Sequence, residues 1–270
     1  MKYVNLGCGG RFINEWINFD FISNSPFVKQ VNLIKGIPLD SEEVDFVYHS
    51  HVLEHFVKSQ GEQFIKECYR VLKTGGVLRV VVPDLEQIAI NYLQTLNEVL
   101  EKNNEENVAR YNWAKVELLD QLVREESGGE MLEIWKQKDL VNEGQIADRL
   151  GDEFLRIRKN ILATSNQNNT VSKLGIVDLL KSRVKQYVFN KLKINSVNLE
   201  LGNFRNNGEV HKWMYDRYSL QELLFNIGFK EVKIVSAFES GITNWEKYST
   251  LDIEDGKIRK PDSLFMEAKK

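Results

Sequence analysis

Short runs of β-branched and aromatic residues alternate with turn residues along the first 84 positions. Such runs predict strands, and their spacing is typical of a parallel sheet with crossover connections. Residues 53–72 instead carry apolar side chains at roughly helical spacing and predict a helix. We expect Thr74-Gly75-Gly76 to cap that helix, because glycine readily adopts the left-handed conformation found at helix ends. The predicted strands cover residues 3–6, 16–21, 28–33, 44–48 and 77–82.

From residue 85 the pattern changes to long segments rich in Leu, Glu, Lys, Gln and Asn with few glycines. Most of these residues favour helices, so residues 85–210 predict a helical insertion. A polar stretch from Thr164 to Thr170 predicts a loop within it. The expected helices cover residues 86–102, 106–126, 130–142, 145–163 and 175–193.

The α/β pattern returns at His211. Ser219, with Glu222 three positions later, predicts the N-cap of a helix that Gly228 ends. Strands at residues 229–237 and 263–268 then complete the sheet. We therefore predict an α/β fold whose core comes from residues 1–84 and 211–270, with residues 85–210 inserted between them.

Composition adds a few limits to this picture. The chain has 270 residues, 36 of them basic and 39 acidic, and a net charge of −3 gives no global footprint for nucleic acid. Cys8 and Cys68 cannot form a disulfide framework and fit a reducing compartment. No segment approaches the roughly 18 apolar residues of a membrane span, and no signal peptide is evident. We expect a cytoplasmic protein that does not bind nucleic acid.

A glycine-rich turn follows the first predicted strand directly, in the sequence Val4-Asn5-Leu6-Gly7-Cys8-Gly9-Gly10. Glycine lets the backbone turn sharply and lets a ligand approach closely. Asp20 ends the second predicted strand, where its carboxylate could bind the two hydroxyls of a ribose. The alternative is a tight loop without a ligand. Together, the turn, the acid and the ordered strands favour a nucleoside-type cofactor at the carboxyl edge of a doubly wound sheet.

Four segments carry a resemblance to a known family: NLGCG, NFD, VDFVYHSHVLEHF and YRVLKTGGVLRVVVPD. The sequence resembles class I S-adenosylmethionine-dependent methyltransferases. More narrowly, it is similar to small bacterial methyltransferases encoded in surface-polysaccharide (capsule and O-antigen) gene clusters, which also have stretches like HKWMYDRYSLQELLFNIGF and KPDSLFMEAKK. The resemblance covers residues 1–84 and 211–270. It implies a Rossmann-like sheet of seven strands and S-adenosyl-L-methionine as cofactor, whereas the helical insertion carries no family motif.

The same resemblance implies roles for individual residues. The glycine turn would lie under the methionine and ribose portions of the cofactor, Asp20 would bind the ribose hydroxyls, and the loop after the fourth strand would lie beside the sulfonium. The implied cofactor-binding residues are Gly7, Cys8, Gly9, Asp20, Asn32, Leu33, Ser50 and His51. The chain departs from the family in having Asn5 and Asn32 where acids are common. Only nine residues, Gly7 to Glu15, separate the first two strands, so the first helix is a single turn or absent.

Three of the four histidines fall at positions 49, 51 and 55. His51 to His55 match the H-x-x-E-H pattern of one zinc-peptidase class, in which two histidines on one helix face bind metal. The alternative is that a backbone carbonyl satisfies His55 while Glu54 faces solvent. No metal ligand is assigned here. The candidate catalytic base is His51 and then His211, since imidazole titrates near neutrality. Asp84 and Tyr215 could also reach the acceptor, and Arg11 could bind the cofactor's carboxylate.

Residues 176–194 form a basic amphipathic segment. Such a helix can lie on an anionic membrane, pack on the protein core, or contact phosphates of an acceptor. The insertion leaves the sheet on the side where ligands bind, so we expect residues 85–210 to form a lid or wall of the acceptor pocket.

The favoured function is methyl transfer to a hydroxyl or phosphate-type oxygen of a sugar or capsular-polysaccharide precursor. The partner is then a small carbohydrate or nucleotide-linked acceptor. A nitrogen acceptor fits equally well. A non-catalytic scaffold that binds S-adenosylmethionine in glycan assembly and a zinc peptidase are the rival hypotheses. The sequence does not indicate an oligomeric state.

Overall fold

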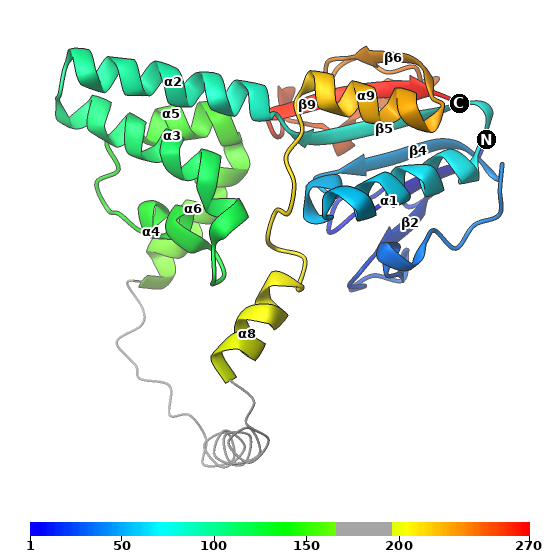
Figure 1. The fold of residues 1–270 in the computed structure, drawn as a ribbon, viewed down its shortest axis with the longest axis horizontal. Helices are drawn as coiled ribbons and strands as arrows, with labels where there is room; N and C mark the ends of the chain where they lie inside the picture. Colours follow the sequence, from blue (N-terminus) through cyan, green and yellow to red (C-terminus); the bar gives the residue numbers. More distant parts are fainter. Residues whose placement is uncertain (166–195) are drawn as a thin grey trace.

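A seven-stranded sheet forms the centre of the protein (Figure 1). The computed structural model describes residues 1–165 and 196–270. The strand order is β3-β2-β1-β4-β5-β9-β6; the first five strands pair in parallel, and β9 is antiparallel to β5 and β6. The predicted α/β sheet is confirmed. Its strands are β1 (Tyr3–Leu6), β2 (Ile17–Asp20), β3 (Val28–Gln30), β4 (Val44–Ser50), β5 (Leu72–Pro83), β6 (Lys230–Ile234) and β9 (Ser263–Lys269).

The two faces of the sheet are covered differently. Helices α1 (Lys58–Val71) and α9 (Arg217–Ile227) lie on one face (Figure 1), where apolar side chains of both helices and the sheet form the main core. On the other face an aromatic layer takes the place of a long helix. It includes the side chains of Trp16, Phe46, Tyr48, Trp245 and Phe265. No helix joins β1 to β2, as the short connection predicted.

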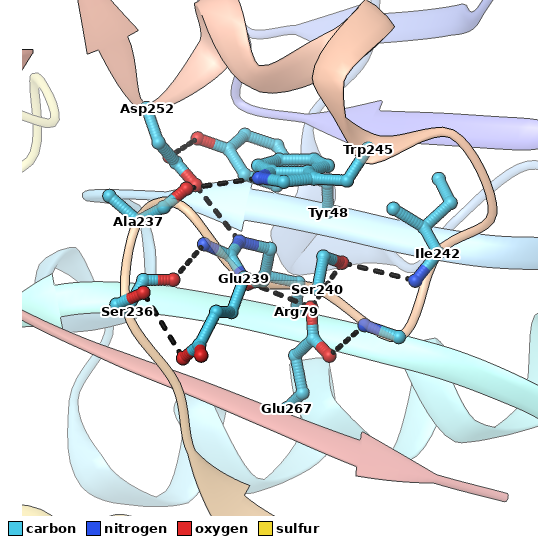
Figure 2. A network of polar contacts seen from close by, with 11 residues as sticks. Tyr48, Arg79, Ser236, Ala237, Glu239, Ser240, Ile242, Trp245, Asp252 and Glu267 are labelled. Carbon is cyan, nitrogen blue, oxygen red and sulfur yellow. Dashed lines mark hydrogen bonds and ion pairs between the residues drawn. The ribbon is translucent and has the colours of Figure 1, made fainter. Parts of the chain in front are cut away.

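The segment over this second face begins after β6 and contains four short elements. They are α10 (Trp245–Tyr248), η3 (Ser249–Leu251), β7 (Ile253–Glu254) and β8 (Lys257–Ile258). Arg79 of β5 is fully buried beneath the segment and bonds to several of its groups (Figure 2). The predicted strand at 229–237 therefore ends early, at Ile234, because the chain turns there to cover the sheet.

The helical insertion lies beside the sheet (Figure 1). It comprises α2 (Leu85–Glu101), α3 (Glu105–Val123), α4 (Gly129–Trp135), α5 (Glu143–Leu150) and α6 (Asp152–Ser165), and it has its own core around Trp113. Helix α8 (Ser196–Arg205) precedes the irregular segment that runs back to the sheet (Figure 1). The basic segment 176–194, the expected helix 175–193 and most of the loop 164–170 lie outside the described residues.

Several predicted helix boundaries are wrong, for local reasons. The helix predicted at 145–163 is two helices, because Gly151 has a φ of +77° and packs against the Arg259 carbonyl, where a Cβ would lie 2.5 Å from the oxygen. The helix predicted at 130–142 ends at Trp135. The strand predicted at 28–33 ends at Gln30, and Asn32 then caps the 3-10 turn η1 (Leu33–Lys35).

The helix predicted over 53–72 begins late. Residues Leu53–His55 form a 3-10 turn, η2, and α1 starts only at Lys58. Strand β5 follows α1 at once, so Thr74-Gly75-Gly76 lies within a strand and does not cap the helix. Gly75 has a φ of +79°, and its N–H donates to the carbonyl of Lys270. The glycines therefore shape a bend in the strand.

Helix α9 is capped one turn before the predicted position. Asp216, not Ser219, is the N-cap: its carboxylate accepts from the N–H groups of Tyr218 and Ser219. Ser219 returns the bond by accepting from the N–H of Asp216, at 3.1 Å. Gly228 ends the helix as predicted, with a φ of +113°.

None of the helices in the described part of the chain is both long and apolar enough to cross a membrane.

Candidate active site

The glycine turn after β1 is locked to the end of β2. Gly7 has a φ of +66°, and a Cβ on it would lie 2.3 Å from Cγ2 of Val52. The N–H of Gly9 donates to Oδ2 of Asp20 at 2.8 Å, and Oδ1 of Asp20 accepts from the N–H of Ile22 at 3.0 Å. Burial raises the pKa of the Cys8 thiol to about 12, so this thiol stays protonated and is a poor nucleophile.

A first cavity of about 300 Å³ opens at the carboxyl ends of β1 to β4. Five of the residues predicted to bind the cofactor line it: Gly7, Asp20, Asn32, Leu33 and His51. Cys8, Gly9 and Ser50 are close in sequence but do not line it. The segment returning from α8 contributes a wall, made of Asn206, Asn207, Gly208 and Lys212.

Asn5 and Arg11 make contacts within the protein, next to the glycine turn. Asn5 is buried, and its Nδ2 donates to the Arg11 carbonyl at 3.0 Å. The Arg11 guanidinium pairs with Glu254 at 2.5 Å. Arg11 therefore has an acidic partner in this structure, and it does not line the first cavity.

A second cavity, of about 270 Å³, lies between the strand ends and the helical insertion. Pro83, Lys260 and Asp262 form its side on the sheet. The insertion supplies three polar residues, Gln121, Arg124 and Glu153. The rest of its wall is mainly apolar and aromatic, made of Met131, Leu132, Trp135, Leu150, Phe154 and Ile157. Neither the Lys260 ammonium nor the Asp262 carboxylate makes a hydrogen bond or ion pair within residues 1–165 and 196–270. Both groups are thus free to meet a ligand.

His51 lines both cavities. It directly follows β4 and has a φ of +54°, a conformation in which a side chain is strained. Its Nε2 lies 2.9 Å from Oγ of Ser263, and its Nδ1 lies 3.2 Å from Oε1 of Glu54. Burial, reinforced by the nearby charge of Lys260, lowers the pKa of His51, so the imidazole is neutral at pH 7 and able to accept a proton.

The other proposed catalytic residues lie elsewhere. Asp84 is the N-cap of α2, where its carboxylate accepts from the N–H groups of Glu86 and Gln87. Burial raises the pKa of Asp84, but its side chain lines neither cavity. His211 also lines neither; it is buried with its ring centroid 5.0 Å from that of His55, and burial lowers its pKa to about 3. Tyr215 is buried against the main core.

Three residues of the site are not predicted from the sequence: Glu54, Lys260 and Asp262. Glu54 was expected on a solvent-facing helix surface, but it is fully buried in the 3-10 turn η2. The H-x-x-E-H pattern therefore does not lie on a helix, which the zinc-peptidase arrangement requires. Glu54 could have been found from its position between two histidines, whereas nothing local marks Lys260 and Asp262.

Comparison with known proteins bears on this arrangement. Residues 20–80 match the family model described as a methyltransferase domain. Over these residues the chain is similar to a methyltransferase domain. The matched segment runs from Asp20 through His51 to β5, along the wall of the first cavity. The comparison with curated proteins finds no match.

Two solved structures illustrate the range of similar folds. A methyltransferase from Archaeoglobus fulgidus that depends on S-adenosylmethionine is 13% identical, with a TM-score of 0.39 over 100% of this chain and 86% of its own. A methyltransferase from Thermotoga maritima, described as a possible histamine N-methyltransferase, is 15% identical, with a TM-score of 0.39 over 100% of this chain and 82% of its own. At such TM-scores neither comparison informs the choice of acceptor.

Proposed function

We propose that the methyl donor binds in the first cavity, that a small acceptor binds in the second, and that His51 stands between them as the catalytic base. The observation that carries this proposal is that His51 lines both cavities. A methyl group passes directly from donor to acceptor, so the two must meet in line, and a shared wall residue marks the place of transfer.

The first cavity has the groups that a nucleoside needs. Asp20 at the end of β2 offers carboxylate oxygens for the ribose hydroxyls while it holds Gly9. Asn32 and Leu33 line the same cavity and are available to hold the adenine. Gly7 brings the backbone close to the ligand. When bound, S-adenosylmethionine supplies a methyl group activated by a positive sulfonium.

The surroundings of His51 suit a base that acts through Nε2. The Glu54 carboxylate beside Nδ1 favours the tautomer with hydrogen on Nδ1, which leaves Nε2 as the acceptor facing Ser263. Nε2 would take the hydroxyl proton of the acceptor when its oxygen receives the methyl group that bound S-adenosylmethionine would supply. The products are the methylated acceptor, S-adenosylhomocysteine and a proton on His51.

The second cavity favours a hydroxyl-rich acceptor. Asp262 accepts and Lys260 donates hydrogen bonds, and the Trp135 and Phe154 rings supply the flat apolar surface on which a sugar ring can pack. Lys260 also suits a phosphate group. These features support a sugar or capsular-polysaccharide precursor, free or nucleotide-linked, methylated on a hydroxyl or phosphate-type oxygen. In this proposal the insertion, residues 85–210, is the acceptor wall, residues 1–84 and 211–270 are the methyltransferase core, and the reaction occurs in the cytoplasm.

The test separates the two cavities with a matched pair of variants. Calorimetric titration with S-adenosylhomocysteine is expected to give micromolar binding to the wild type, at least tenfold weaker binding to Asp20→Asn, and unchanged binding to Asp262→Asn. Transfer of labelled methyl from S-adenosylmethionine is then measured with a panel of nucleotide sugars. His51→Asn is expected to slow transfer by about 10²–10⁴-fold, with S-adenosylhomocysteine affinity changed by a few-fold at most.

The outcomes distinguish the alternatives. Equal weakening by Asp20→Asn and Asp262→Asn contradicts the assignment of two separate cavities. Tight binding without transfer to any sugar, amine or extract-derived acceptor contradicts catalysis and supports a non-catalytic scaffold. Unchanged transfer in His51→Asn removes His51 as the base.

A further inference from the structure

Three potential metal ligands meet beside the first cavity, and one of them, Glu54, also contacts the proposed base His51. One oxygen of Glu54, one ring nitrogen of His55 and one of His211 all lie within 4.8 Å of one another. Glu54 and His55 come from the turn η2, while His211 comes from the segment returning from the insertion. Glu54 is fully buried and His211 is 4% exposed.

These groups lack the partners that burial normally requires. Oε1 of Glu54 lies 3.2 Å from Nδ1 of His51, but Oε2 of Glu54 and Nδ1 of His211 make no hydrogen bond in the described part of the chain. A buried carboxylate without a cation or a full set of hydrogen bonds is costly, and buried charges are usually paired or bound to metal.

His55 is oriented as metal-binding histidines are. Its Nδ1 lies 3.2 Å from the carbonyl oxygen of Val210, to which the protonated nitrogen donates. The other nitrogen, Nε2, then keeps its lone pair. A ligating histidine almost always donates its second ring N–H to a carbonyl or carboxylate in this way, which fixes the tautomer and the ring orientation.

We propose that Glu54, His55 and His211 bind a divalent transition-metal ion, and that Zn²⁺ is the ion that fits them best. Two imidazoles and one carboxylate are a common zinc ligand set, which leaves a fourth position for water or another ligand. Ligands about 2.0–2.1 Å from zinc in a tetrahedron lie about 3.3 Å apart. Small side-chain rotations would bring the three ligand atoms, now within 4.8 Å, to that spacing.

The ion would fasten two parts of the chain that already touch. The carbonyl of Glu54 accepts from the N–H of Lys212 at 2.7 Å, and Lys212 and His55 both line the first cavity. Metal binding would therefore stabilise the return segment, and with it one wall of that cavity. This proposal concerns metal binding and stability, and it stands whether or not the methyl acceptor is a sugar.

The test uses the full chain, freed of metal with a chelator and then titrated with Zn²⁺ alone in a calorimeter. One ion per chain is expected to bind the wild type and to raise its melting temperature. Glu54→Gln and His211→Asn should bind Zn²⁺ at least a hundredfold more weakly, and Zn²⁺ should not raise their melting temperatures.

Glu117→Gln is the matched control. Glu117 is also a buried glutamate, but it pairs with Arg149 in the insertion, so this variant should bind Zn²⁺ like the wild type.

The wild type alone can overturn the proposal, even where a variant fails to fold. Folded wild-type protein that binds no stoichiometric Zn²⁺ contradicts it. So does X-ray absorption at the zinc edge that shows no imidazole nitrogens around a bound ion. Equal zinc affinity in wild type, Glu54→Gln and His211→Asn would place the ion elsewhere and would equally reject this site.

Discussion

The imidazole of His49 is fully buried, and neither ring nitrogen has a hydrogen-bond partner among the described residues. It comes from β4 and packs edge-on against the Phe64 ring, with the centroids 5.1 Å apart. Burial lowers its pKa to about 4. An unfolded histidine titrates near about 6.5, so between these values the unfolded chain binds a proton that the folded chain does not.

This difference makes the protein less stable in mild acid. Stability is retained above the unfolded pKa and falls as the pH drops from about 6.5 toward 4. Between pH 7 and 5.5, His49 alone is expected to remove about 1.2 kcal/mol from the free energy of unfolding. His49→Leu removes the titrating group without breaking a hydrogen bond. Between pH 7 and 5.5 the free energy of unfolding of this variant should therefore fall by about 1 kcal/mol less than that of the wild type. Urea denaturation at both pH values, with a chelator present, measures the difference.

The control for this comparison is internal, since His211 is present in both proteins and titrates in the same direction. Equal losses of stability in wild type and His49→Leu between pH 7 and 5.5 would show that His49 does not titrate on unfolding.

Single residues also show how far the sequence could predict the candidate site. Gly7 and Asp20 were found because their roles are local: a left-handed turn after one strand and an acid at the end of the next. Glu54 was misplaced because a 3-10 turn replaces the expected helix and directs its side chain inward. Lys260 and Asp262 reach the site from the far end of the chain, by pairing of β9 with β5, which local pattern does not reveal.

At the scale of elements, the capping of α9 shows why boundaries are harder to predict than the elements themselves. Asp216 and Ser219 each bond to the backbone N–H of the other, which makes a complete capping box. Ser219 and Glu222 have the same spacing and a similar composition, so the sequence offers two candidate starts one turn apart. The start is fixed by a tertiary contact just before it, because the carbonyl of Tyr215 accepts from the N–H of Leu85 and so positions Asp216.

This assignment predicts different effects for two substitutions in one helix. Asp216→Ala leaves the N–H groups of Tyr218 and Ser219 without their acceptor, and it is expected to cost about 1–2 kcal/mol of stability. Glu222→Ala, the matched control, should change stability by no more than about 0.5 kcal/mol, because the Glu222 side chain is exposed and accepts a hydrogen bond from the likewise exposed Tyr218 hydroxyl. Thermal or urea unfolding of the two variants measures both. A larger loss for Glu222→Ala would reverse the assignment of the cap.

The strands were predicted better than the helices of the insertion. Strands β1 and β4 and the second half of β5 are mostly buried runs with β-branched residues, so their pattern is visible without tertiary information. Helix breaks in the insertion instead depend on distant contacts. Gly151 separates α5 from α6 where it meets the carbonyl of Arg259, more than 100 positions later, and no local pattern contains that partner.

At the scale of the whole molecule, Arg79 connects segments that are far apart in sequence (Figure 2). Its guanidinium donates to Asp252 and to Glu267, each at 2.9 Å, and to the carbonyls of Ser236 and Glu239. The guanidinium carbon lies over the Trp245 ring, 4.5 Å from the ring centroid. One side chain of β5 thus holds β9 and the segment that covers the second face of the sheet, where no long helix does so.

The balance of charge makes this network sensitive to the loss of its cation. Asp252 and Glu267 are both almost fully buried, with Arg79 as the cation that they share. Other donors assist them: the Tyr48 hydroxyl bonds to Asp252, and the N–H of Gly241 bonds to Glu267 at 2.7 Å. Burial raises the pKa of Asp252 even with Arg79 present. Without Arg79 at least one carboxylate would have to remain charged without a cation or take up a proton.

Arg79→Met is therefore expected to reduce the free energy of unfolding at pH 7 by about 3–5 kcal/mol, the usual cost of leaving a buried charge without its partner. Arg156→Met is the matched control: it removes the same group from an ion pair with Glu254, but this arginine is 57% exposed, and the expected loss is less than about 1 kcal/mol. Because the orphaned carboxylates gain protons as the pH falls, the deficit of Arg79→Met should shrink below about pH 5. Urea denaturation of the three proteins at pH 7 and pH 4.5 measures both effects. A loss for Arg79→Met no greater than that for Arg156→Met would mean that the aromatic layer, and not this network, holds the covering segment on the sheet.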